Sequence, residues 1–333
     1  MLDKKRSYLK VIITVVASLL IFAFAGWLYL NQQYTKDQLS VWAYQVPPNV
    51  QVVESRIELT DKGSFYFRTS QPVLANSDTF NQDCPRQEVG NPILGCYAEG
   101  RIYIYNVQND QLDGIKEVTA AHEMLHAVWE RMSPSEQKRV GALLRSEYAK
   151  LVESDLKDRM DYYARTEPGE LENELHSIIG TEVKDISPEL EQYYARYFED
   201  RSAVLELHNK YDSIFRALRA ESDNLYTELT TLGAGIETRS AQYNSDVASL
   251  SRDIDDFNQR ADSGDFSSIA QFNRERAALA ARSTQLETDR ALINNDIAAY
   301  NVKYSEYQKL ALQIESLNKS IDSIGDLEPA PSL

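Results

Sequence analysis

The sequence contains little histidine, cysteine or positive charge, and each shortage limits what the protein can be. Its 333 residues include four His, two Cys, and 35 Lys and Arg against 51 Asp and Glu, a net charge of −16. Residues 1–30 carry four bases and one acid, so the remaining 303 residues carry −19. An acidic surface repels phosphate groups. The composition therefore excludes nucleic-acid binding and gives the main part of the chain no attraction for anionic lipids.

Charged residues are also absent from the apolar run at residues 11–30. Twenty residues in a helix cross a bilayer core of roughly 30 Å. Four basic residues precede the run, and basic residues stay on the cytoplasmic side. We therefore expect a cytoplasmic tail (1–8), an uncleaved single transmembrane signal anchor (9–30) and an extracytoplasmic remainder at the cell membrane. A cleaved signal peptide is the alternative, but its shorter apolar region ends at small residues, whereas large side chains from Trp27 to Leu30 end this run.

The two cysteines, Cys84 and Cys96, lie close together in the expected extracytoplasmic part. An oxidising compartment favours a disulfide between them, which would contribute about 2–3 kcal/mol by restricting the unfolded chain. The alternatives are two unpaired thiols or, less favoured at this spacing, zinc ligation by the pair. We predict the disulfide.

Proline, cysteine and tryptophan are all missing from residues 201–325, which marks a domain boundary near residue 200. Apolar residues recur there at steps of 3, 4 and 7 from Leu218 to Phe257 and from Phe272 to Ile321, a spacing typical of a coiled coil. Turn residues at 262–266 lie between the two sets. We expect an antiparallel coiled-coil hairpin with arms of roughly 80 Å, which would contact a protein partner.

The other regions follow from composition. Polar residues and Pro47-Pro48 predict a tether at 31–50, and residues 326–333 are expected to be a disordered tail. Mixed patterning predicts a domain at 51–200 whose short strands precede its helices, an α+β arrangement. The expected strands are Val50–Glu58, Ser64–Arg68 and Arg101–Asn106. The expected helices are Ile115–Met132, Ser133 to about Lys157, one near 170–180 and one from Ser187-Pro188.

The most informative motif is His122-Glu123-Met124-Leu125-His126. Residues four apart lie one turn apart on the same helical face, so both imidazoles can reach one metal ion. Neutral imidazoles suit zinc, and Glu123 lies where it can take a proton from a water at that metal. The motif predicts a zinc site at His122 and His126 with Glu123 as general base.

A catalytic zinc site requires a third protein ligand and one open position. The candidates are His176, His208 and the acidic residues downstream of the motif. In the helix expected near 170–180, Glu172 and Glu174 lie on opposite margins of the apolar face, and His176 points further away. Helical periodicity therefore does not choose between the two Glu residues.

The motif, followed 48 residues later by Glu174-Leu-His-Ser, resembles the gluzincin metallopeptidases, and within them those whose third ligand opens a Glu-x-x-Ala-like helix motif, as in the anthrax lethal factor group. The resemblance covers residues 98–182. It implies a zincin-like fold, zinc held by His122, His126 and Glu174, and Glu123 as the base. Ser177 replaces the usual Ala and His176 an aromatic, which keeps His176, with Glu172 and Glu182, as alternative ligands.

The same resemblance implies that a strand beside the motif helix binds the substrate backbone, and Arg101–Asn106 precedes the helix in the matching order. It also implies a Tyr or His that stabilises the developing oxyanion. Tyr162 and Tyr163 precede the expected Glu174 helix, and Tyr163 is the favoured residue.

The leading functional prediction is a membrane-anchored, extracytoplasmic zinc metallopeptidase, a hydrolase acting on a protein or peptide, with a cell-wall peptide as an open variant. The alternative is a non-catalytic envelope scaffold built on the coiled coil, with a vestigial or structural zinc site. The motif glutamate favours the enzyme, because a structural site does not require Glu123. His208 is expected to pack or to lie at the surface.

Overall fold

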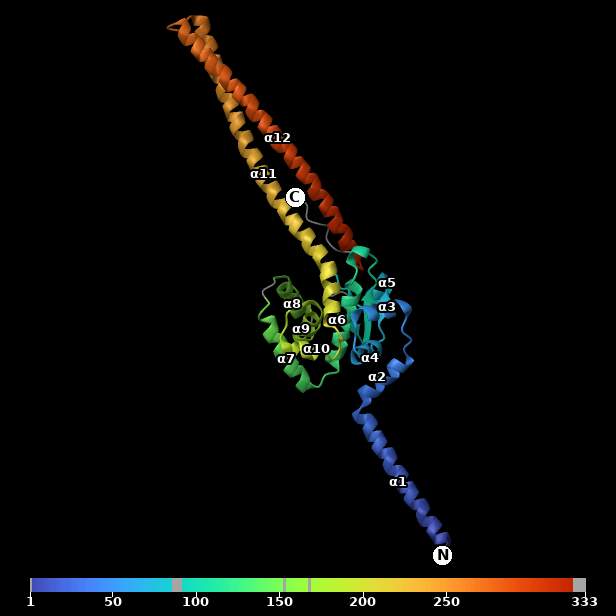
Figure 1. The fold of residues 1–333 in the computed structure, drawn as a ribbon. Coiled ribbons are helices and arrows are strands. Elements are labelled where there is room, and N and C mark those ends of the chain that lie inside the picture. The colour runs from blue at the N-terminus through green and yellow to red at the C-terminus, as the bar shows by residue number, and fades with distance from the viewer. Residues whose placement is uncertain (1, 86–91, 152–153, 167–168, 326–333) are drawn as a thin grey trace. The chain divides into compact units, whose positions relative to one another are not determined.

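The computed structural model describes residues 2–85, 92–151, 154–166 and 169–325 (Figure 1). The described chain is mostly helical and contains one small three-stranded sheet. It divides into two compact units, the first formed by residues 1–213 and a segment beginning at Asn318, the second by residues 214–317. The expected tail at 326–333 lies outside the described residues.

The N-terminal part of the chain forms two successive helices, α1 (Leu2–Leu30) and α2 (Gln32–Ala43). Within α1, the stretch Ile13–Leu30 is long and apolar enough to cross a membrane, and none of it is buried in the protein. Where a polar tether is expected, α2 is a helix that packs against α4 (Asp61–Thr69). This segment is therefore a packed helix of the first unit rather than a tether.

Two of the expected strands are wrong. The first is α3 (Pro48–Ile57), and the second is the α4 helix, whose N-cap Thr60 accepts a hydrogen bond from the Gly63 amide. In α3 the buried residues are Val50, Val53, Glu54 and Ile57, which follow the helical period of 3.6 rather than the strand period of 2. Burial on one helical face outweighs the β-propensity of the valines.

The sheet contains β1 (Val73–Ala75), β2 (Gly95–Ala98) and β3 (Arg101–Tyr105) in the order β1-β3-β2. The predicted strand at 101–106 is confirmed as β3. It pairs parallel with β1 and antiparallel with β2, which places Tyr97 opposite Ile102. Ile102 and Ile104 are buried on one face of the sheet, toward the main core.

The other face of the sheet is covered by α5 (Ser77–Asp83) and by the disulfide between Cys84 and Cys96. The predicted disulfide is confirmed, with the two Cα atoms 5.9 Å apart. Because Cys96 belongs to β2, the bridge ties that strand to the end of α5. The segment after α12 returns to the same place, where the Asn81 amide donates to the Ser323 carbonyl oxygen (2.8 Å).

The core of the first unit is built around α6 (Ile115–Glu130), the predicted motif helix, and α9 (Leu171–Glu182), the helix expected near 170–180. The two helices pack directly against each other. Gly180 permits this approach, since a Cβ there would lie 2.5 Å from the Leu125 side chain. Close packing of α6 and α9 brings His122, His126 and Glu174 together.

The remaining helices of this unit are α7 (Pro134–Tyr148), α8 (Ser154–Thr166) and α10 (Pro188–Tyr194). The predicted starts at Ser133 and Ser187 are confirmed as N-caps followed by proline at the first helical position. The expected continuation of the first of these helices to about Lys157 is wrong, because α7 ends at Tyr148 and a separate α8 follows.

The second unit consists of the long helices α11 (Arg201–Ser263) and α12 (Ile269–Ile321), apart from the ends that belong to the first unit. Ion pairs link their side chains in antiparallel order: Lys303–Glu228, Arg239–Asp296, Arg282–Asp253 and Arg260–Glu275. Phe257, Phe266 and Phe272 cluster at the connecting turn. Part of the predicted apolar stripe is buried, including Leu225 and Leu250, whereas Ile254 is 37% exposed. The coiled-coil packing itself stays a prediction.

Candidate metal centre

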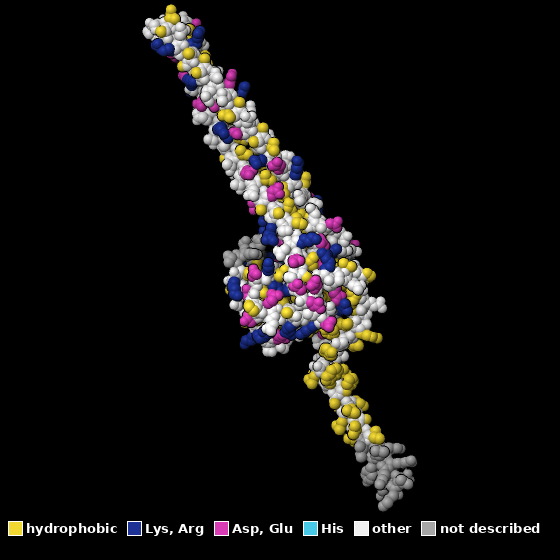
Figure 2. All heavy atoms as spheres, in the orientation of Figure 1, with side chains coloured by type: hydrophobic (Ala, Val, Ile, Leu, Met, Phe, Trp, Pro, Cys, Tyr) yellow, Lys and Arg dark blue, Asp and Glu magenta, His cyan; other side chains and the backbone are white. Residues whose placement is uncertain are grey.

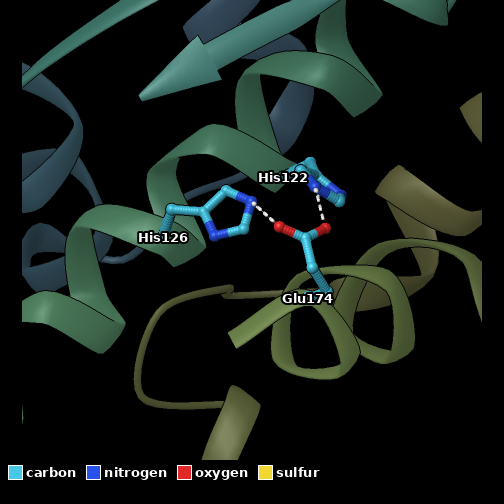
Figure 3. A group of neighbouring side chains, drawn as sticks. All are labelled: His122, His126 and Glu174. Carbon is cyan, nitrogen blue, oxygen red and sulfur yellow. Dashed lines mark ion pairs between the residues drawn. The ribbon is translucent and has the colours of Figure 1, made fainter. Parts of the chain in front are cut away.

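Three side chains converge between α6 and α9 (Figure 3). The Glu174 carboxylate lies between the two imidazoles, with its oxygens 3.7 Å from His122 Nε2 and 3.4 Å from His126 Nε2. One donor atom from each residue lies within 4.8 Å of the other two. The Glu174 side chain is 4% exposed, and the two imidazoles are 15% and 10% exposed.

The donor set and its spacing fit a small divalent metal ion. Zinc bonds to imidazole nitrogen and carboxylate oxygen are about 2.0–2.1 Å, so tetrahedral ligands lie about 3.3 Å apart. The two Nε2–O separations are close to this value. Glu174 Oε2 also has no hydrogen-bond partner although it is buried, and a buried carboxylate oxygen without a donor is costly. A cation between the three residues would satisfy it.

A fourth residue, Asn173, orients one of the ligands and was missed from the sequence. Its Oδ1 lies 2.9 Å from His126 Nδ1, and its Nδ2 donates to Glu170 Oε2 at 3.0 Å. Since the amide nitrogen donates to Glu170, Oδ1 accepts from Nδ1–H, which leaves the Nε2 lone pair facing Glu174. Such outer partners fix the tautomer and orientation of ligating imidazoles. One indication of this role is present in the sequence, namely that Asn173 directly precedes the proposed ligand Glu174.

The motif glutamate, Glu123, is 5% exposed and lines the same cavity as the three converging residues. Gly95 of β2 makes room for it, because a Cβ at this position would lie 2.6 Å from Glu123 Oε1 and 2.5 Å from Thr119 Cγ2. The strand backbone can therefore approach α6 only at a glycine. Glu123 therefore packs beside Gly95 of β2 and lines the same cavity as the three converging residues.

Two cavities meet at the cluster. One of about 760 Å³ is lined by β2, Glu123 and Glu174, and the other, about 890 Å³, extends toward α7. Both are lined by Tyr97, His126 and Asn173. The two cavities therefore share the His126 side of the cluster and form a hollow that continues from it in both directions.

The strand that borders this hollow is β2, not β3. The resemblance pointed to Arg101–Asn106 as the strand that binds a substrate backbone, but β3 is the central strand and its edges pair with β1 and β2. Among the described residues, β2 pairs with β3 alone, so its other edge faces away from the sheet.

Tyr163 of α8 also lines the smaller cavity. Burial, together with the charge of Glu174, raises its pKa well above the ordinary value, so the phenol stays protonated. The side chain of Tyr162 lies outside the described part of the structure. Glu182, one of the alternative ligands, reaches this cavity but forms a bidentate ion pair with Arg159 at 2.7 and 2.9 Å.

The other alternative ligands lie away from the cluster. Glu172 is ion-paired with Arg145 of α7. His176 is fully buried, with Nε2 2.8 Å from the Tyr193 hydroxyl, and burial lowers its pKa to about 3. His208 contacts the Tyr211 hydroxyl at 3.1 Å, which agrees with the packing role expected for it. Glu174 is therefore the acidic residue that the fold brings to both imidazoles.

The cluster is electrostatically asymmetric. Burial lowers the pKa of His122, but the carboxylates of Glu174 and Glu123 outweigh burial and hold this pKa above its ordinary value. Burial dominates at His126 and lowers its pKa. Burial also raises the pKa of Glu174, yet the two imidazoles and Arg159 hold it below the ordinary value. Without a metal, protonation of His122 and ionisation of Glu174 therefore favour each other.

No known family model, curated protein or solved structure shows a significant match to this chain. The group formed by His122, His126 and Glu174 can thus be assessed only by its own geometry, and by that geometry it can hold a metal ion.

Proposed function

We propose that the protein is a membrane-anchored zinc metallopeptidase that hydrolyses peptide bonds of a protein or peptide substrate. The observation that carries the proposal is the convergence of His122, His126 and Glu174 at one point, with Glu123 lining the same cavity. Two imidazoles and one carboxylate are a donor set that zinc prefers, and three protein ligands leave a position for water. The gluzincin resemblance and a zincin-like fold for the first unit belong to this proposal.

Each residue then has a chemical role. Zinc bound there would polarise the scissile carbonyl and acidify the attacking water. Glu123 would take the proton of that water and deliver it to the leaving amine. Tyr163, kept protonated by burial, would donate a hydrogen bond to the substrate carbonyl oxygen as negative charge develops on it. The β2 edge would hold the substrate backbone beside Glu123.

The proposed location follows from α1 and from the disulfide. A span at Ile13–Leu30 with basic residues before it would keep the N-terminus cytoplasmic and place the rest of the chain outside. The Cys84–Cys96 bridge is compatible with an oxidising, extracytoplasmic compartment. We propose that α11 and α12 form an antiparallel coiled-coil hairpin that contacts a protein partner.

The test is Glu123→Gln, which removes the base but none of the three ligands. We expect zinc content to stay at the wild-type level while hydrolysis of a peptide library falls by about 10²- to 10⁴-fold, the usual contribution of a general base. Glu136→Gln is the matched control, because Glu136 is ion-paired with Arg196 and lines neither cavity. Wild-type hydrolysis in Glu123→Gln would remove this mechanism.

The second candidate is a scaffold, favoured by the length of α11 and α12, which contain 63 and 53 residues. A scaffold with a structural metal would bind zinc but cleave no peptide. Zinc content and library hydrolysis measured on the same wild-type sample separate the two functions, since zinc at one equivalent without any cleavage would support the scaffold.

A further inference from the structure

The helix α2 presents an apolar face to solvent. Trp42 is 86% exposed and Leu39 is 60% exposed, whereas Asp37 is 5% exposed. At about 100° per residue, and measured in the same direction round the helix from Asp37, Leu39 lies at about 160° and Trp42 at about 220°. Both side chains are therefore on the side of the helix opposite Asp37. Thr35, which lies between them on this side, is uncharged. The outward face of α2 therefore carries two large exposed apolar side chains and no acidic residue, in a strongly acidic chain.

This face cannot turn inward, because the other side of α2 is fixed. Arg131 Nε and Nη2 donate to the two Asp37 carboxylate oxygens at 3.0 and 3.1 Å, and both side chains are 7% exposed. The Thr69 hydroxyl donates to the Asp37 carbonyl oxygen at 2.8 Å. Rotating α2 to cover Trp42 would break the buried Arg131–Asp37 ion pair. Trp42 and Leu39 therefore remain outside.

The position of α2 in the chain indicates what covers this face. Asn31 alone separates α2 from α1, whose stretch Ile13–Leu30 is long enough to cross a bilayer. Hydrophobic side chains remain exposed along this N-terminal part of the chain (Figure 2). At 1.5 Å per residue, the twelve steps along the chain from Leu30 to Trp42 cover at most about 18 Å along a helix. This is within reach of the headgroup region, where tryptophan is enriched.

We propose that the face of α2 formed by Leu39 and Trp42 lies in the lipid headgroup interface and seats the first unit directly on the bilayer surface. The inference rests on the proposed membrane insertion of α1. An interfacial helix binds by burying apolar side chains at this depth. The uncharged face also avoids the repulsion that the acidic remainder of the chain would meet at anionic lipids.

The α2 helix is connected to the candidate site through the side chain of Arg131. Arg131, which holds Asp37, also donates through Nη1 to the Tyr97 hydroxyl at 2.8 Å, and Tyr97 of β2 lines both cavities. The hollow is consequently held at a fixed height above the membrane. Peptide segments close to the membrane surface are the substrates that this arrangement selects.

The test measures the depth of Trp42 with the full-length chain in phosphatidylcholine nanodiscs. A Trp27→Phe background leaves Trp42 and Trp129, and Trp129 is buried in the core. We expect phosphatidylcholine brominated near the headgroup to remove most of the Trp42 emission, lipid brominated near the chain end to remove less, and aqueous iodide to remove little. Adding Trp42→Phe to this background should abolish quenching by bromolipid.

Strong quenching of Trp42 by iodide, without quenching by bromolipid, would overturn the proposal. Protection from both quenchers, together with crosslinked dimers that disappear in Trp42→Phe, would assign the face to a second copy instead and also overturn it. Bromolipid quenching of Trp27 in the single Trp42→Phe variant tests α1 separately. The measurement requires neither zinc nor substrate, so a failure of peptidase activity is distinguishable from a failure of this inference.

Discussion

The identity of the third ligand makes the sharpest prediction, because α9 presents two glutamates two residues apart. Glu174 uses both carboxylate oxygens toward the imidazoles, at 3.7 and 3.4 Å. Glu174→Gln has nearly the same shape but offers one neutral oxygen, and its amide group would place N–H hydrogens near an imidazole or the metal. Structural four-ligand zinc sites bind with about 10–16 kcal/mol, or about 2.5–4 kcal/mol per ligand. We therefore expect zinc affinity to fall by about 10²- to 10³-fold.

Glu172→Gln is the matched control. It makes the same chemical change on the same helix, but Glu172 is paired with Arg145, and both side chains are at least one-third exposed. An exposed ion pair contributes about 0–1 kcal/mol to stability. Because Glu172→Gln removes none of the three proposed ligands, zinc affinity should stay within about twofold of the wild-type value, a change of about 0.4 kcal/mol in binding free energy.

The assay is competition for zinc against a chromophoric chelator, with circular dichroism to verify that both variants fold. A loss of affinity in Glu172→Gln with none in Glu174→Gln would identify Glu172 as the ligand and refute our assignment. Wild-type affinity in both variants would show that neither glutamate contributes, and that the convergence in α6 and α9 does not bind the metal.

Two further predictions concern the imidazoles. Asn173→Ala removes the acceptor of His126 Nδ1–H, and loss of such an outer partner costs about 10- to 100-fold in metal affinity; unchanged affinity in the chelator assay would show that His126 needs no orientation. Zinc affinity should also fall tenfold per pH unit below the raised pKa of His122, because one proton must leave that imidazole before the metal binds. The lowered pKa of His126 moves any second competing proton to lower pH than the first, so a slope of two that begins at the same pH as the first loss of affinity would contradict the assignment.

The sequence predicted the local features of the site well because each rests on a short pattern. Ser133 and Ser187 before prolines predicted the starts of α7 and α10, and the spacing of His122 and His126 placed both imidazoles on one face of α6. Each of these patterns spans one helical turn. Their physical cause, a cap or a helical face, acts within that turn, so a single sequence was enough.

The errors arose where residue preference and periodicity disagreed. The valines of α3 suggested a strand, although Val50, Val53 and Ile57 already have the helical spacing that their burial confirms. In α4 the aromatic residues Phe65, Tyr66 and Phe67 suggested a strand in the same way, although only Phe67 is fully buried. The order of the strands could not be predicted either, because β2 at Gly95–Ala98 is short and is held in place by the Cys84 bridge and by β3.

The choice between Glu172 and Glu174 required the tertiary structure. Both lie at similar angles from the apolar centre of α9, so periodicity gave no preference. The neighbouring helices determine which glutamate reaches the imidazoles. Helix α6 carries the imidazoles on one side of α9, and α7 carries Arg145, which pairs with Glu172, on the other. Gly180 is part of the same decision, because only a residue without a side chain lets α9 approach Leu125 closely enough.

These contacts also explain how the cluster keeps its arrangement before a metal binds. The raised pKa of His122 and the lowered pKa of Glu174 mean that a proton on the imidazole faces a carboxylate charge across the site. This proton occupies the electrostatic position of the cation and offsets the cost of burying Glu174. Asn173 holds His126 independently of that proton. A metal ion bound there would compete with the proton on His122 within ligands already in place, so we expect metal affinity to fall as the pH falls through the raised pKa of His122.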